Sequence, residues 1–269
     1  MEEKILKAIY TGLERGENSA LASVTSIDGS SPGKTGAIMG VWPDGSIVGT
    51  VGGGNLEFEV TQKALECIET NKSCEYEFDL NHSSDLKMIC GGKAKVFIKV
   101  FIANPHLIIV GGGHIGLELY KLADFLGFNA IVIDDRKEFA NKERFPKAYE
   151  LYVGDVGEIL ENYENVKQSY VVIATRGHAH DESALRAVVN RDFKYVGMIG
   201  SRSKVQETFE KLLADHYTKE SLESIYSPVG ISISNGEPSE IAFGIMCEIL
   251  MVKNNAVLSH MRDIKKVEL

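Results

Sequence analysis

Apolar and polar residues follow two different rhythms along this chain, one before and one after residue 104. Before it, apolar residues recur every three or four positions in 2–16 and again after the glycines at 52–54, which predicts two amphipathic helices. Shorter runs rich in β-branched and aromatic residues predict strands at 20–27, 37–51, 74–80 and 93–102, the second of these being a hairpin around 43–45. This first part is therefore expected to be an α+β domain.

After residue 104, apolar strand runs alternate with helical patterns. Strands are predicted at 107–111, 129–135, 149–155, 169–175 and 194–201, and helices at 116–127, 181–191, 204–216 and 239–253. Such alternation is typical of a doubly wound parallel sheet with right-handed crossovers. We therefore predict an α/β chain, with an N-terminal α+β domain at 1–103, a Rossmann-like domain at 104–253 and a polar tail at 254–269.

Charge and hydropathy narrow the functional classes. The chain has 269 residues, with 29 Lys and Arg against 38 Asp and Glu, which gives a formal net charge of −9. An acidic balance argues against nucleic-acid binding, because phosphate neutralisation needs a basic face. No apolar run reaches the ~18 residues that a membrane span needs. The first residues have no apolar core of a secretory signal, so we expect a cytoplasmic protein without membrane or nucleic-acid partners.

The first candidate site follows the strand at 107–111. Gly111, Gly113 and Gly116 form a G-x-G-x-x-G pattern between an apolar strand and an amphipathic helix. In this context the first glycine permits a tight turn, the second lets a pyrophosphate approach the backbone, and the third lets helix pack on strand. Asp134 ends the next strand, where an acid usually binds a ribose hydroxyl. The pattern predicts a nucleotide or pterin-phosphate ligand; an empty loop in a Rossmann-like fold is the alternative.

Two further polar loops follow later strands of the same sheet. The loop at 175–181 carries Arg176, His178 and His180, and the loop at 200–204 carries Arg202 and Lys204. The carboxyl ends of parallel strands meet at one edge, so we expect these loops to converge there. The cations would neutralise an anionic ligand, and the histidines would transfer protons or contact a metal. Alternatively, Asp181 caps the following helix and Lys204 is solvated.

The first domain has its own candidates. Gly52, Gly53 and Gly54 separate a strand from a helix and would hold an anion at the helix terminus, or else form a tight turn capped by Asn55. Cys90 lies between an apolar pair and two glycines. Its thiolate suits a soft metal centre or a persulfide, so Cys90 is our candidate metal ligand; a buried structural thiol is the alternative.

Taken together, these motifs resemble the XdhC/CoxI family of accessory proteins for xanthine dehydrogenase and other molybdenum hydroxylases. The resemblance covers nearly the whole chain and includes Gly52–Gly54, Cys90, His114 within the 111–116 loop, and the 175–181 loop. The remaining motifs are 29–32 with Met39, 49–51 with Glu57, 88–92, 198–202, 227–231 and 237–242.

The resemblance implies a chaperone for a cofactor, and no catalytic residue is assigned. It implies that the protein binds the molybdenum cofactor (molybdopterin), supports its sulfuration with a cysteine desulfurase as sulfur donor, and inserts it into a xanthine dehydrogenase-type apoenzyme. It also implies a homodimer. NAD(P) is a further candidate ligand, and an NAD-dependent oxidoreductase or a nucleotide-sensing Rossmann module is the alternative function.

Overall fold

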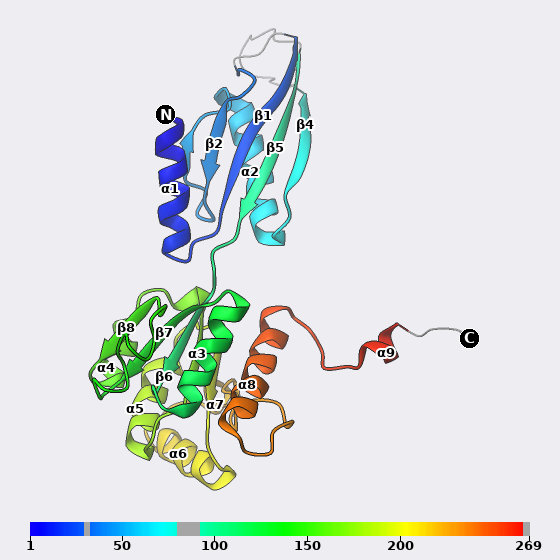
Figure 1. Ribbon diagram of the computed structural model, residues 1–269. Helices are drawn as coiled ribbons and strands as arrows, with labels where there is room; N and C mark the ends of the chain where they lie inside the picture. The colour runs from blue at the N-terminus through cyan, green and yellow to red at the C-terminus, as the bar shows by residue number, and fades with distance from the viewer. Residues whose placement is uncertain (30–32, 80–91, 266–269) are drawn as a thin grey trace. The chain divides into compact units, whose positions relative to one another are not determined.

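The computed structural model describes residues 1–29, 33–79 and 92–265. The chain divides into two compact units, Met1–Asn104 and Pro105–Leu269 (Figure 1). Among the described residues, no helix combines the length and the apolar character that crossing a membrane requires.

The first unit is built on an antiparallel sheet with strand order β3-β2-β1-β5-β4. Its elements are α1 (Glu2–Glu14), β1 (Ser19–Gly29), β2 (Ile38–Val41), β3 (Ile47–Gly49), α2 (Gly54–Thr70), β4 (Cys74–Asp79) and β5 (Gly92–Phe101). Burial alternates strictly along β5, where Val96 and Ile98 are buried and Lys95 and Lys99 are exposed. This period of two is that of a sheet with one face packed on a core.

The buried face of that sheet packs against α2. Leu56, Val60 and Ala64 of this helix contact the inward residues of the sheet, and Met39 and Val51 complete the same cluster. On the opposite face, α1 forms a smaller cluster around Ile5, Ile9 and Trp42. The predicted hairpin at 37–51 is confirmed as β2 and β3, which pair antiparallel.

The second unit contains a five-stranded parallel sheet in the order β10-β9-β6-β7-β8. The strands are β6 (His106–Val110), β7 (Asn129–Asp134), β8 (Glu150–Val153), β9 (Ser169–Ile173) and β10 (Tyr195–Met198). The helices are α3 (His114–Leu126), α4 (Val156–Glu161), α5 (His178–Val188), α6 (Arg202–Ala214), α7 (Lys219–Glu223), α8 (Pro238–Lys253) and α9 (Met261–Ile264), with a short 3₁₀ turn at Val166–Gln168. The strand order reverses between β6 and β9, so a ligand site is expected at the carboxyl ends of these two strands.

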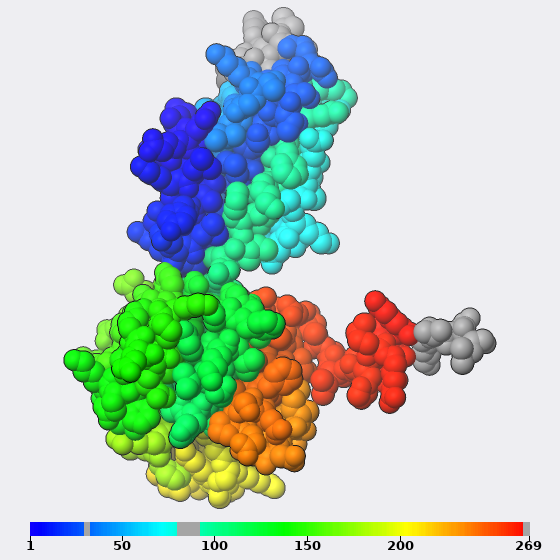
Figure 2. Space-filling view, viewed as in Figure 1, coloured from blue at the N-terminus to red at the C-terminus, as the bar shows by residue number. Residues whose placement is uncertain are grey.

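The helices of this unit form layers on both faces of the sheet. One face packs against α3 and α8 through Leu119, Ile245 and their neighbours. The other face packs against the four helices from α4 to α7 through Leu160, Leu185 and Leu212. In the space-filling view α8 and the segment before it lie against α3 (Figure 2). The predicted fold class, an α+β part followed by a Rossmann-like parallel sheet, is confirmed.

Two helix starts differ from the sequence-based alternatives. The residue that caps α2 is Gly53, so Asn55 lies inside the helix. The residue that caps α5 is Gly177, so Asp181 lies in the first turn, and its carboxylate is used for other contacts described below. In both cases the chain enters the helix earlier than the polar side chain indicated. At α2 the φ of +78° at Gly53 favours glycine, whereas Gly177 before α5 has an extended backbone that any residue adopts.

Candidate functional site

The connection from β6 into the first turn of α3 is packed so closely that three of its glycines leave no room for a side chain. A Cβ on Gly111, whose φ is +113°, would overlap the carbonyl of Ala174. A Cβ on Gly112 would overlap the carbonyl of Phe139, and one on Gly116 would overlap the carbonyl of Gly111. The fold itself therefore requires these three glycines.

Gly113 is different from its three neighbours. Its φ of −68° is ordinary for any residue, and among the described residues no atom lies within 4 Å of the Cβ that a larger residue would carry. Gly113 is also the residue that caps α3, whose first N–H groups lack partners within the helix and carry the positive end of the helix dipole. The space in front of Gly113 is thus suited to an anion.

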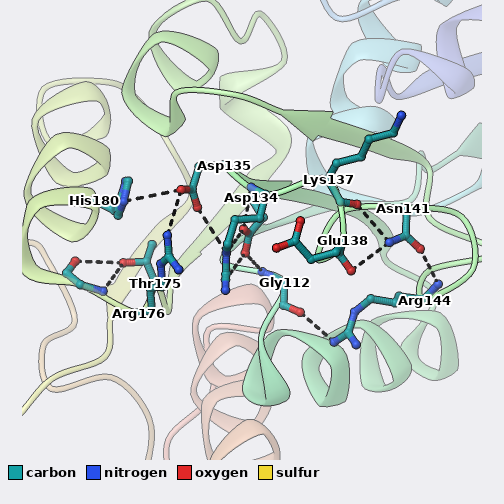
Figure 3. A network of polar contacts seen from close by, with 12 residues as sticks. Gly112, Asp134, Asp135, Lys137, Glu138, Asn141, Arg144, Thr175, Arg176 and His180 are labelled. Carbon is teal, nitrogen blue, oxygen red and sulfur yellow. Dashed lines mark hydrogen bonds and ion pairs between the residues drawn. The ribbon is translucent and has the colours of Figure 1, made fainter.

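Both backbone groups of Gly112 are held by side chains (Figure 3). The Gly112 N–H donates to the Asp134 carboxylate at 2.8 Å, and the Gly112 carbonyl accepts from Arg144 Nη2 at 3.0 Å. Asn141 fixes the backbone of Arg144, because its side-chain oxygen accepts a hydrogen bond from the backbone N–H of Arg144 at 3.0 Å. The end of β7 and the segment that follows it therefore hold Gly112 in place through Asp134 and Arg144.

Asp134 is buried, with 3% of its side chain exposed, and its carboxylate accepts four hydrogen bonds. One comes from Gly112, and Arg136 donates the others through its backbone N–H at 3.0 Å, Nε at 2.9 Å and Nη2 at 3.1 Å. Burial raises the pKa of Asp134, but the hydrogen bonds from Arg136 and Gly112 outweigh burial, so the pKa lies below its usual value. A carboxylate has about four acceptor positions, so that of Asp134 is filled by the protein itself.

The loop after β9 is organised by Asp181, which is fully buried. Its Oδ1 accepts from the Thr175 hydroxyl at 2.6 Å and from the Thr175 N–H at 3.2 Å, and its Oδ2 forms an ion pair with Lys204 of α6. Lys204 is thus a partner of Asp181 rather than a solvated residue. The sequence offered no signal for this contact, since the two residues are 23 positions apart on different helices.

A small hollow opens at the carboxyl edge where these loops meet, and we call it the edge hollow. Its volume is about 220 Å³, open solvent included, and its polar lining comprises Asp134, Asp135, Arg136, Thr175, Arg176 and His180. Arg176 Nη2 lies 3.4 Å and His180 Nε2 lies 3.8 Å from Asp135 Oδ2 (Figure 3). Two loops that are 41 residues apart thus converge within one unit.

Some predicted site residues of the second unit lie outside this constellation. His178 and His180 are two positions apart on α5, so their side chains project about 200° apart, and only His180 lines the edge hollow. Arg202 is exposed at the first position of α6, and His114 begins α3 without lining the hollow. The described residues contain no group of three or more His, Cys, Asp or Glu able to hold a metal ion.

The glycine turn of the first unit is held by one side-chain bridge. The Thr50 hydroxyl donates to Glu57 at 2.5 Å and accepts from the Gly52 N–H at 3.1 Å. Gly53 and Gly54 have φ values of +78° and +61° and precede or begin α2. Cys90, the predicted metal ligand, lies outside the described residues, as do Ser30, Ser31 and Pro32.

The family comparisons match both units. A model for the XdhC Rossmann domain matches residues 107–249, and a model for the XdhC and CoxI family matches residues 12–79. The sequence is 33% identical over 240 residues to YqeB, an uncharacterized protein of Escherichia coli, a match that covers 88% of this chain and 44% of YqeB.

Two further likenesses concern proteins described by reference to xanthine dehydrogenase. The chain is 28% identical over 163 residues to a probable xanthine dehydrogenase subunit from Bacillus subtilis, covering 61% of this chain and 47% of that protein. The chain therefore spans less than half the length of these two curated relatives. A crystal structure from Bacillus halodurans, described as a xanthine dehydrogenase, shares the fold with a TM-score of 0.52 at 21% identity, over 96% of this chain and 98% of that one.

Proposed function

This chain belongs to the XdhC and CoxI family, and on that premise we propose that it is an accessory protein of a xanthine dehydrogenase-type enzyme. It binds the molybdenum cofactor, supports its sulfuration and inserts it into the apoenzyme. The likeness to the Bacillus subtilis protein, a probable part of a xanthine dehydrogenase, supports the choice of client. The observation that carries the proposal is Gly113, which is the one glycine of its loop that the fold leaves open.

The phosphate end of the cofactor fits the residues of the second unit. A phosphate in front of Gly113 would accept hydrogen bonds from the backbone N–H groups at the start of α3, and the dipole of this helix favours an anion there. Arg176, with 58% of its side chain exposed, supplies a cation at the same edge. A net charge of −9 does not oppose this, since local cations outweigh the total charge at short range.

The sulfur chemistry of the proposal rests on Cys90. It would provide a thiolate toward the metal or carry a persulfide received from a cysteine desulfurase. Gly52, Gly53 and Gly54 would bring the start of α2 close to a second anionic group. A homodimer belongs to the same proposal.

The test uses full-length protein purified from cells that make the molybdenum cofactor. Molybdenum and pterin are expected to co-purify with the parent protein and to be lost from Gly113→Val, because the added side chain would occupy the phosphate position. The φ of Gly113 is ordinary, so the variant should fold, at the cost of about 1 kcal/mol for a poorer cap. Equal cofactor content in parent and variant would show that the loop is only architectural.

Two further measurements separate the parts of the proposal. Cys90→Ser should retain the pterin and lose molybdenum or sulfur, whereas unchanged metal content would remove Cys90 from the site. Stabilisation by NAD(H) together with turnover of an alcohol or hydroxy acid would instead establish an oxidoreductase, and stabilisation by NAD(H) without turnover would establish a sensor.

A further inference from the structure

The acid that would bind a ribose in many Rossmann folds is not available for that purpose here. All four hydrogen bonds to the Asp134 carboxylate come from Gly112 and Arg136. The Arg136 guanidinium is also held from its face, since its central carbon lies 3.6 Å from the centroid of the Phe139 ring. A ligand hydroxyl could reach Asp134 only by displacing a bidentate, stacked arginine, which makes such contact unfavourable.

The next residue has the opposite character. Asp135 lines the edge hollow with 32% of its side chain exposed. Among the described residues, its contacts with basic side chains are all long: 3.4 Å to Arg176 Nη2, 3.6 Å to Arg136 Nε and 3.8 Å to His180 Nε2. Charge-assisted hydrogen bonds between nitrogen and oxygen are shorter, about 2.7–2.9 Å. The carboxylate of Asp135 therefore retains acceptor positions that a bound molecule can use.

The size of the edge hollow indicates what can enter. The enclosed part of the hollow is only about 10 Å³, room for about one water molecule, whereas a pocket that encloses a whole small-molecule ligand has ~300–1,000 Å³. A ligand could therefore place a single hydroxyl or amino group into it, and the rest of the ligand, with its phosphate, would lie over its mouth along the same edge. Gly111 both lines the hollow and belongs to the glycine loop, so the two places are continuous.

We propose that Asp135 is the residue that selects the organic end of the ligand, by accepting hydrogen bonds from two adjacent donors. This rests on the proposed binding of a phosphorylated cofactor at Gly113. Two sources present such donors: the vicinal hydroxyls of a ribose, and the amino group and ring N–H of the aminopyrimidinone in a pterin. Arg176 and His180 both face the same oxygen of Asp135, at 3.4 and 3.8 Å.

Calorimetry on the full chain with defined probes tests this assignment. The probes are AMP and 2′,3′-dideoxy-AMP for the ribose, 6-hydroxymethylpterin phosphate and its lumazine counterpart (an oxo group in place of the 2-amino group) for the pterin, and inorganic pyrophosphate for the loop alone. Asp135→Asn should weaken binding of AMP or of the pterin phosphate by about tenfold or more. Pyrophosphate affinity should be unchanged or rise, because a negative charge is removed. The matched control is Asp192→Asn, an exposed acid on the α5–β10 connection, which should change neither.

The modified probes distinguish ligand contact from a structural role. Dideoxy-AMP lacks both hydroxyls, and the lumazine probe lacks the amino donor but keeps the ring N–H. Each change should weaken binding to the parent several-fold and should weaken binding to Asp135→Asn much less. If the AMP pair behaves in this way, the group that Asp135 binds is a ribose; if the pterin and lumazine pair does, it is a pterin.

If Asp135→Asn binds AMP and the pterin phosphate as the parent does, while Gly113→Val loses them, Asp135 has no such role and the phosphate site stands. Binding of pyrophosphate without either organic probe would also overturn the assignment to Asp135. If the parent binds none of the probes, the phosphate site fails and the assignment fails with it.

Discussion

The glycine turns before α2 and α3 look alike in sequence, but the physical reason why glycine is needed differs between them. Before α2, Gly53 and Gly54 have positive φ values, and among the described residues a Cβ on either would meet nothing within 4 Å. At the start of α3, Gly112 and Gly116 are required because backbone carbonyls lie where a side chain would be. Gly113 is required for neither reason. The comparison teaches that a glycine points to a ligand most clearly where the fold does not need it.

The largest expected effect tests the close packing before α3. Gly116→Ala should lower the free energy of unfolding of the second unit by about 3 kcal/mol, because the new methyl group would overlap the carbonyl of Gly111. Hydrogen exchange of α3 amides measures the change, with Gly113→Ala as the control, which should lose only about 1 kcal/mol through a poorer cap. Equal exchange in the two variants would contradict the distinction between these glycines.

The next effect tests backbone conformation before α2. Gly53→Ala should cost the first unit about 2 kcal/mol, because φ +78° with ψ +178° is a combination that only glycine adopts readily. Trp42, the one tryptophan of the sequence, lies in the first unit, so its fluorescence reports the unfolding of that unit. Gly54→Asn is the milder control, since asparagine tolerates a left-handed φ. An unchanged midpoint for Gly53→Ala would mean that the turn relaxes.

A smaller effect tests the bridge that closes the first turn. Thr50→Val keeps the shape of the side chain and removes its hydrogen bonds with Glu57 and Gly52. Thr50 is exposed, and water can replace part of what is lost, so the cost should be about 0.5 kcal/mol. Trp42 fluorescence during denaturation measures it. A loss as large as that of Gly53→Ala would show that the bridge, not the backbone conformation, determines the turn.

The smallest effect appears only at acid pH and concerns the Asp134 carboxylate, which accepts a hydrogen bond from Gly112 before α3. The folded pKa of Asp134 lies below the value of about 3.9 expected when unfolded. The unfolded chain therefore binds a proton first as the pH falls, so the stabilisation by Asp134 is complete above about pH 5. It decreases as the pH falls through 3.9 toward the folded pKa. Asp134→Asn should flatten this part of the pH dependence in α3 hydrogen exchange, and an unaltered slope would contradict it.

Local pattern sufficed for the strand, glycine turn and helix from 107 to 126, because each of these elements is encoded by neighbouring residues. It also sufficed to bring the loops after β6 and β9 to one edge, since parallel strands leave no other arrangement. Contacts between segments far apart in the sequence could not be predicted from local pattern. The bond from Arg144 to the Gly112 carbonyl joins residues 32 positions apart, and the ion pair of Lys204 with Asp181 depends on how α5 and α6 pack.

The candidate site shows the same division. Asp134 was singled out because an acid at the end of the second strand is a familiar signal. The competing interaction came from Arg136, two residues along, whose orientation depends on the ring of Phe139. Asp135 carried no separate signal in the sequence beyond its charge. Its exposure to the edge hollow is a property of the loop geometry, which no periodicity reveals.

The packing of α8 beside α3 has a consequence for synthesis of the chain. Ile245, Met246 and Ile249 complete the apolar cluster that covers one face of the parallel sheet, and Glu248 accepts hydrogen bonds from Tyr195 and from the Gly230 N–H. Until the ribosome has released this helix, the growing polypeptide lacks part of its interior. We therefore expect the nascent Rossmann unit to remain unable to capture a ligand until α8 has left the ribosome.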